Sequence, residues 1–122
     1  MKPNEMTDQE LNEAIAIEVM GWHEFMGWWC EERLSHRNAP DGKEHWRKYK
    51  TKDWNPTHDL NQAWMLVEKF KGTSLSVHIY CGFALNGVQI SKNLKEISFV
   101  EFKDNPARAL SEACLTAKRG ES

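Results

Sequence analysis

The fold of this chain is decided by residues 74–102, which read SLSVHIYCGFALNGVQISKNLKEISFVEF. Apolar and polar side chains alternate over residues 74–81, and this period of two predicts a half-buried strand. An Asn-Gly pair inside residues 83–90 is a hairpin signal. Residues 96–102 carry a further strand pattern, so the sequence predicts an antiparallel sheet.

Three segments with helical periodicity surround these strands. Thr7 followed by Glu10 forms a capping-box pattern, which predicts a helix over residues 8–22. Further helices are predicted over residues 58–70 and, with proline at the first position, over residues 106–117. We expect the three helices to cover the sheet. The side chains expected in the core are Trp22, Trp64, Val77, Ile79, Phe99 and Leu110.

Length and composition predict one globular domain over residues 1–122. The hydrophobic content of 40% and the charged content of 28% are typical of a chain that buries a single core. No apolar run approaches the roughly 18 residues that a membrane span needs, and the N-terminus lacks the pattern of an export signal. The three cysteines lack CxxC spacing, which favours reduced thiols. We therefore expect a cytoplasmic protein that does not bind membranes.

Charge is distributed unevenly along the chain. Residues 1–32 contain eight acidic residues and one basic residue, whereas residues 43–52 contain five basic residues and one acidic residue. The nearly equal numbers of acidic and basic residues in the whole chain argue against a uniformly basic nucleic-acid binder, although residues 43–52 can form a local basic patch.

Helical periodicity is lost between the first two predicted helices, where a long Trp-rich and basic insertion spans residues 25–54. A structureless connection of this length is uncommon, so the segment either contains a short hairpin or carries the activity. Its end reads HWRKYKTKDW over residues 45–54. Such a run can stack bases on its aromatic rings while its cations meet phosphates. Alternatively, its tryptophans cap the core and its lysines protect a sheet edge.

A second aromatic concentration, residues 22–29, holds more ring area than one helical face can bury. Exposed tryptophan and methionine are typical of interfaces, which predicts a homodimer or a tight complex with a partner. The candidate binding residues from both concentrations are Trp28, Trp29, Trp46, Arg47, Lys48, Tyr49, Lys50 and Trp54.

No motif in the sequence supports catalysis or metal binding. Cys30, His36 and His45 do not match a known zinc spacing. Cys81 follows His78 by three residues, and strand alternation places the two side chains on opposite faces. Phosphate-binding, dinucleotide-binding and hydrolase motifs are absent from the sequence. We therefore expect no enzyme activity, no metal and no cofactor.

Three parts of the chain resemble the phage ABA-sandwich family. They are the opening residues 6–22 with their Met-Gly-Trp triplet, the middle residues 53–64 with Trp-Asn-Pro, and the strand and helix of residues 96–117. The resemblance implies an α/β (α+β) fold, an α-β-α sandwich with a small antiparallel sheet covered by helices, in a phage or prophage protein. It supplies no catalytic residues, and it does not extend over residues 25–52.

We expect a small, non-catalytic binding protein that acts on a host protein or complex. Such a protein would inhibit host bacterial immunity, for example as an anti-CRISPR type of inhibitor, or would serve as a host-takeover factor. The alternative is a binder of a nucleotide signal or nucleic acid through residues 43–54. An enzyme with no visible motif and a structural role in the virion are further alternatives.

Overall fold

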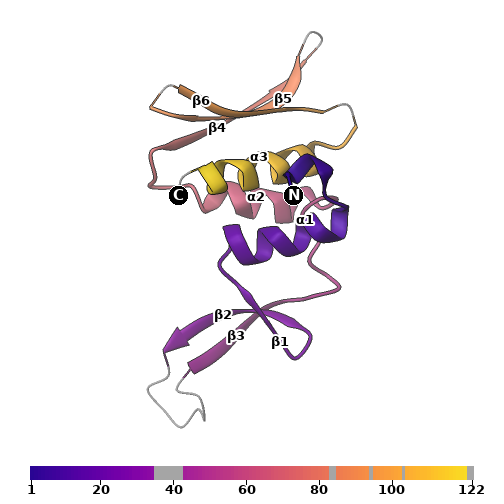
Figure 1. Ribbon diagram of the computed structural model, residues 1–122, viewed down its shortest axis with the longest axis vertical. Helices are drawn as coiled ribbons and strands as arrows, with labels where there is room; N and C mark the ends of the chain where they lie inside the picture. Colours follow the sequence, from indigo (N-terminus) through magenta and orange to yellow (C-terminus); the bar gives the residue numbers. More distant parts are fainter. Residues whose placement is uncertain (35–42, 83–84, 94, 103, 121–122) are drawn as a thin grey trace.

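The computed structural model describes residues 1–34, 43–82, 85–93, 95–102 and 104–120. Two antiparallel sheets and a helical layer form the molecule, and Figure 1 shows the helices between the sheets. Sheet A contains β1 (His23–Phe25), β2 (Trp28–Leu34) and β3 (Lys43–Lys50). Sheet B contains β4 (Leu75–Cys81), β5 (Asn86–Lys92) and β6 (Lys95–Glu101). The mixed α/β fold with antiparallel sheets is confirmed, and it is consistent with an ABA sandwich.

The first helix begins at the predicted capping box. A short 3-10 helix, η1 (Pro3–Glu5), precedes α1 (Asp8–Ala14), and η2 (Ile15–Val19) continues α1 as a π-helix. Thr7 Oγ1 accepts a hydrogen bond from Glu10 N at 3.2 Å, and the Glu10 carboxylate accepts one from Thr7 N at 2.9 Å. Gly21 adopts φ 72°, so the chain leaves the helix before Trp22, where we had predicted its end. Trp22 is nevertheless buried, as predicted.

The second helix, α2 (Leu60–Glu68), presents a different face to the core from the one predicted. Gln62, Ala63 and Leu66 are buried, whereas Trp64 is 49% exposed, so its predicted burial is wrong. The cause lies in Gln62, whose side-chain amide donates to Asp53 O at 2.9 Å and accepts from Asn55 N at 2.5 Å. These bonds turn a polar residue inward, and Trp64 consequently faces outward.

The third helix, α3 (Pro106–Gly120), covers sheet B. Its buried face consists largely of small side chains, which lets it pack closely on β5 and β6. Val88 and Ile90 of β5 are fully buried beneath it, and Leu110 is buried as predicted. Described residues contain no helix long and apolar enough to cross a membrane.

Two core predictions in sheet B are wrong. Phe99 is exposed because it lies opposite Gln89 on the outer face of the sheet, where its ring covers Gly87. Ile79 is also exposed, and Val77 is only half-buried. Both belong to β4, an edge strand, while α3 packs mainly on the other two strands. β4 and β5 form a hairpin, but the Asn86-Gly87 pair that signalled its turn instead begins β5, opposite Cys81 and Tyr80.

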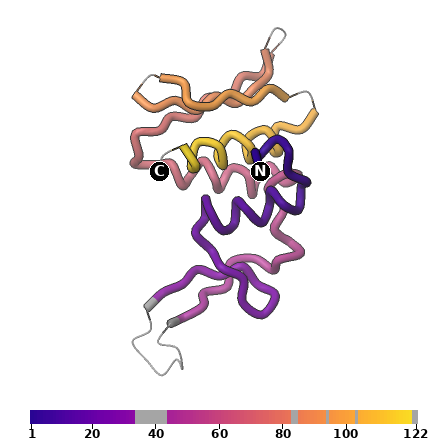
Figure 2. Tube along the Cα trace, viewed as in Figure 1, coloured from indigo at the N-terminus to yellow at the C-terminus, as the bar shows by residue number. Residues whose placement is uncertain are grey.

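The insertion of residues 25–54 forms a hairpin with a third strand. β2 pairs with β3 from Trp28 opposite Lys50 to Leu34 opposite Lys43, and β1 pairs with the other edge of β2. His36, considered above as a metal ligand, lies outside the described residues. Sheet A thus extends from the helical layer at one end of the molecule, as the trace in Figure 2 shows.

Candidate binding surface on sheet A

A β-bulge decides which way the candidate side chains of β3 point. Trp29 pairs with Tyr49, but the next residue of β2, Cys30, pairs with Arg47, so Lys48 is an extra residue in β3. Successive residues of a strand point to opposite faces, and paired residues share a face. Arg47 and Tyr49 therefore lie on opposite faces of sheet A. Regular alternation along β3 would place both side chains on one face, and the bulge separates them.

Three of the eight candidate residues turn inward and join Trp22 in a ring cluster. Trp54 lies 4.8 Å from Trp22 and 5.1 Å from Tyr49, measured between ring centroids. Its indole N–H donates to Asn12 O at 3.0 Å, and the Tyr49 hydroxyl lies 3.4 Å from Met65 Sδ. Trp29 and Trp54 are almost fully buried. The ring cluster, Trp22, Trp29, Tyr49 and Trp54, therefore attaches sheet A to the helices.

The loop that carries Trp54 is held by a network of amide and hydroxyl hydrogen bonds. Asn12 Nδ2 donates to Asn55 Oδ1 at 3.1 Å, and Thr57 N donates to Asn12 Oδ1 at 3.2 Å. Asn105 Nδ2 donates to Thr57 O at 2.9 Å, which ties the loop to the start of α3. The Trp-Asn-Pro-Thr segment is thus a buried structural connection between the helices.

Trp28, Arg47 and Lys50 lie on the opposite face, which we name the outer face of sheet A. The Arg47 guanidinium carbon lies 5.2 Å from the Trp28 ring centroid, and the Lys50 ammonium lies 5.7 Å from it. Pairing of Phe25 with Trp28 brings Phe25, which is 42% exposed, to the same face. Met26, 79% exposed, occupies the adjoining turn. Apolar and cationic groups therefore alternate across this face.

Two histidines complete the outer face, and they were not among the predicted site residues. His23 Nε2 lies 2.7 Å from His45 Nδ1, within hydrogen-bond distance. The Phe25 ring stacks on His45 with ring centroids 4.0 Å apart. Periodicity within one segment could not reveal this group, because only the β1-β2-β3 register brings His23, Phe25 and His45 together.

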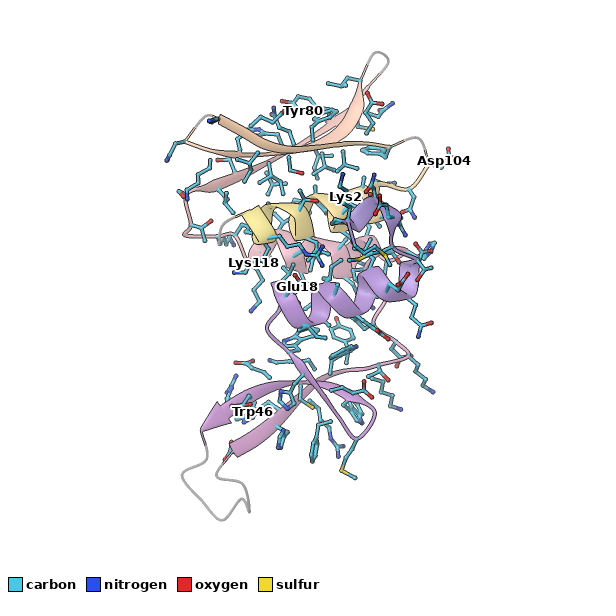
Figure 3. The ribbon with its side chains drawn as sticks, in the orientation of Figure 1. Lys2, Glu18, Trp46, Tyr80, Asp104 and Lys118 are labelled. Atoms are coloured by element: carbon cyan, nitrogen blue, oxygen red, sulfur yellow. The ribbon has the colours of Figure 1, made fainter. Side chains whose placement is uncertain are left out.

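The remaining candidates, Trp46 and Lys48, point to the face that carries Trp29. Trp46 is 45% exposed and is labelled on sheet A in Figure 3, and the Arg33 guanidinium lies 3.6 Å above its ring. Lys48 Nζ forms an ion pair with Glu31 at 3.1 Å. Hydrogen bonds from Lys48 and Arg33 lower the pKa of Glu31 below its usual value. The basic segment is thus partly neutralised by the acidic N-terminal third.

Two surface pockets adjoin the ring cluster. One, of about 500 Å³, lies between α1 and sheet A and is lined by polar residues together with Trp29 and Trp54. The other, of about 460 Å³, lies between sheet A and α2 and includes Met20, Trp22 and Met65. Trp22, Trp29 and Trp54 are each at most 5% exposed, so these three rings offer little surface for stacking in either pocket.

The described residues offer no metal centre, and the buried thiols of Cys30 and Cys114 are not activated. No three His, Cys, Asp or Glu side chains gather there in a way that could hold a metal ion. Burial raises the pKa of the Cys114 thiol to about 12 and also raises that of Cys30, against the opposing effect of Arg47. A raised pKa disfavours the nucleophilic thiolate form.

Fold and surface together define a small α+β protein with a sheet that exposes aromatic, thioether and cationic groups. The model of the Phage ABA sandwich domain family matches residues 13–115, and the chain belongs to this family. The family supports a phage origin. A search of curated proteins finds no match.

A solved structure of a phage protein from Bacillus cereus ATCC 14579 has a similar fold, with a TM-score of 0.58. The similarity covers 96% of this chain and 97% of that chain at 16% sequence identity. Because the similarity extends over nearly all of both chains, it includes the overall arrangement of the helices and strands.

Proposed function

We propose that this chain is a non-catalytic binding protein of a phage or prophage, which binds a host protein through the outer face of sheet A. Its expected place of action is the host cytoplasm, as an inhibitor of bacterial immunity or as a host-takeover factor. One observation carries the proposal: Phe25 and Met26 are exposed beside Trp28, which carries Arg47 and Lys50 over its ring.

The composition of the outer face matches what protein interfaces use for affinity. Aromatic, methionine and arginine side chains are enriched at interfaces, and tryptophan and arginine are frequent among the residues whose truncation costs most. Outside the ring cluster, sheet A makes few contacts with the helical layer. Its outer face is therefore available for a partner. The phage origin of the family supports a partner from the bacterial host.

Geometry favours a protein over a nucleic acid as the partner. A base would have to stack on an accessible ring, yet Trp54 and Tyr49 belong to the ring cluster and Arg33 lies over Trp46. The Trp28 ring is already in contact with the cationic side chains of Arg47 and Lys50. Furthermore, Lys48 is paired with Glu31, which reduces the positive charge available to phosphates.

The test uses the immobilised chain in a lysate of the host, with Trp28→Ala as the variant and Trp64→Ala as its matched control. Both residues are tryptophans, and Trp64 is exposed on α2 rather than on sheet A. We expect the wild type and Trp64→Ala to retain the same host protein. Trp28→Ala should weaken its binding roughly 30-fold, mainly through faster dissociation, as truncation of an interface anchor costs about 2 kcal/mol or more.

Further arms separate the alternatives. If the ligand were a nucleic acid, replacing Arg47, Lys48 and Lys50 together by glutamate would abolish binding, and wild-type affinity would fall steeply with salt. In cells, the wild type and Trp64→Ala should restore plaque formation on a host with an active defence system, whereas Trp28→Ala should not. Binding that is equally strong with Trp28→Ala and Trp64→Ala would contradict the outer face as the site.

A further inference from the structure

The two edges of sheet B differ in how they are protected from pairing. The β6 edge carries Lys95, Glu96 and Glu101, and charged side chains are a usual protection of edge strands. The β4 edge, Leu75–Cys81, contains no charged residue and no proline. Within the described chain, β5 is the only strand that pairs with β4. β4 therefore leaves one row of backbone donors and acceptors open to another strand.

The same strand carries uncovered apolar side chains. Val77 and Ile79 lie opposite Ile90 and Val88 of β5, on the sheet face that α3 covers. The helix packs on β5 and β6, so Val88 and Ile90 are fully buried, whereas Ile79 is 44% exposed. The apolar layer of sheet B thus continues past the edge of the helix onto β4.

β4 is self-complementary in one antiparallel register. If two copies pair with His78 opposite His78, all seven residues of both strands pair, and Val77 of each copy lies opposite Ile79 of the other. Directly opposed apolar pairs on one face stabilise antiparallel sheets. A shift by two residues in either direction shortens the ladder and separates these two side chains. A second copy therefore fits this edge with the exposed apolar residues facing each other.

We propose that β4 pairs with β4 of a second copy of this chain, around a two-fold axis at His78, so that two three-stranded sheets become one six-stranded sheet. Such an interface is isologous and closed, and it removes the unprotected edge of both copies. It uses the end of the molecule opposite to sheet A, as Figure 1 shows. The dimer therefore leaves both outer faces of sheet A free, and it does not depend on the function proposed for them.

The first test compares two lysine substitutions by sedimentation at high concentration. Ile79 and Ile97 are both exposed isoleucines of sheet B, on opposite edge strands. We expect the wild type and Ile97→Lys to sediment at twice the mass of the 14.2 kDa chain, and Ile79→Lys at the mass of one chain. Circular dichroism verifies that both variants are folded, since each change is made at an exposed position.

The second test reads the register through an engineered disulfide, in a Cys81→Ser background that removes the exposed native thiol. His78→Cys should form a disulfide-linked dimer on mild oxidation, because directly paired residues lie about 4.5–5.5 Å apart between Cα atoms. Ser76→Cys is the matched control. It faces Tyr80 of the other copy, so the two cysteines lie about 13 Å apart, beyond the reach of a disulfide.

Four results would overturn the proposal. A wild-type chain that sediments as a monomer at all concentrations excludes it, and so does a dimer that survives Ile79→Lys. Cross-linking of Ser76→Cys as efficient as that of His78→Cys excludes this register. If Trp28→Ala dissociates the dimer and Ile79→Lys does not, the copies associate through sheet A instead.

Discussion

The six tryptophans of this chain show how strongly a residue's role depends on its neighbours in space. Trp22, Trp29 and Trp54 are buried in or beside the ring cluster, whereas Trp46 and Trp64 are exposed. Even the adjacent residues Trp28 and Trp29 of β2 have different roles. The Trp29 side chain points to the helices, whereas the Trp28 ring lies on the outer face beside cationic side chains. The aromatic residues thus divide into a structural group and a surface group that are interleaved in the sequence.

This division predicts opposite effects for two tryptophan truncations. Trp54→Ala should lower the free energy of unfolding by about 3 to 5 kcal/mol, because it removes a buried ring and its hydrogen bond to Asn12 O. Trp64→Ala should change it by about 0.5 kcal/mol or less, as is usual at the surface. Urea unfolding followed by circular dichroism measures both values. Equal losses in the two variants would contradict the assigned burial.

At the scale of elements, an ionic group joins the start of α1 to α3. Arg108 of α3 forms an ion pair with Asp8, and it also donates to Met6 O at 2.6 Å. His58 Nε2 lies 2.6 Å from the other oxygen of Asp8. Burial raises the pKa of Asp8, but the hydrogen bonds from His58 and Arg108 outweigh this effect, so the pKa is lowered overall. Asp8 therefore stabilises the folded chain when it is ionised.

The sign of this shift predicts how stability depends on pH. An aspartate of lowered pKa adds stability above its unfolded value of about 3.9, and this contribution is lost as the pH falls through the lower folded value. The difference in unfolding free energy between the wild type and Asp8→Asn should decline as the pH falls below about pH 4. Asp104→Asn, which alters an exposed carboxylate, is the control. A difference that grows on acidification would contradict the assignment.

The sequence predicted where helices and strands lie better than it predicted which of their faces is buried. Capping and alternation located α1, α3, β4 and β6, because those signals are local. The burial of Trp64 was wrong because the orientation of α2 is set by hydrogen bonds of Gln62 to residues outside the helix. Similarly, the candidate residues of β3 were located, but the bulge at Lys48 assigned them to two faces. Contacts between distant segments determine which face of an element is buried, and no local sequence pattern contains those contacts.

At the scale of the whole molecule, the two sheets lie at opposite ends of a helical layer, with Trp46 on one and Tyr80 on the other (Figure 3). Sheet B is backed by α3, which contributes a long buried face. Sheet A contributes mainly Trp29 and the half-buried Tyr49 to the core. The core is therefore concentrated in the helices and sheet B, and the ring cluster connects it to the proposed binding surface.

This unequal distribution predicts unequal local stability. Regions with few buried apolar contacts open at a lower free energy than the core does. Backbone amides of β2 and β3 should exchange with deuterium faster than those of β5 and α3. Trp54→Ala should accelerate exchange in sheet A more than in β5, because it removes part of the ring cluster. Uniform protection of all four elements would instead show that the chain opens as one cooperative unit.

The ring cluster also gives the protein an optical signature. The indoles of Trp22 and Trp54 lie 4.8 Å apart between centroids with their planes inclined at 65°. Chromophores this close and held at a fixed inclination couple their electronic transitions, which produces paired bands of opposite sign in circular dichroism. Because one indole follows α1 and η2 while the other follows β3, these bands depend on the attachment of sheet A to the helices. Their intensity therefore reports that attachment in solution without any added label.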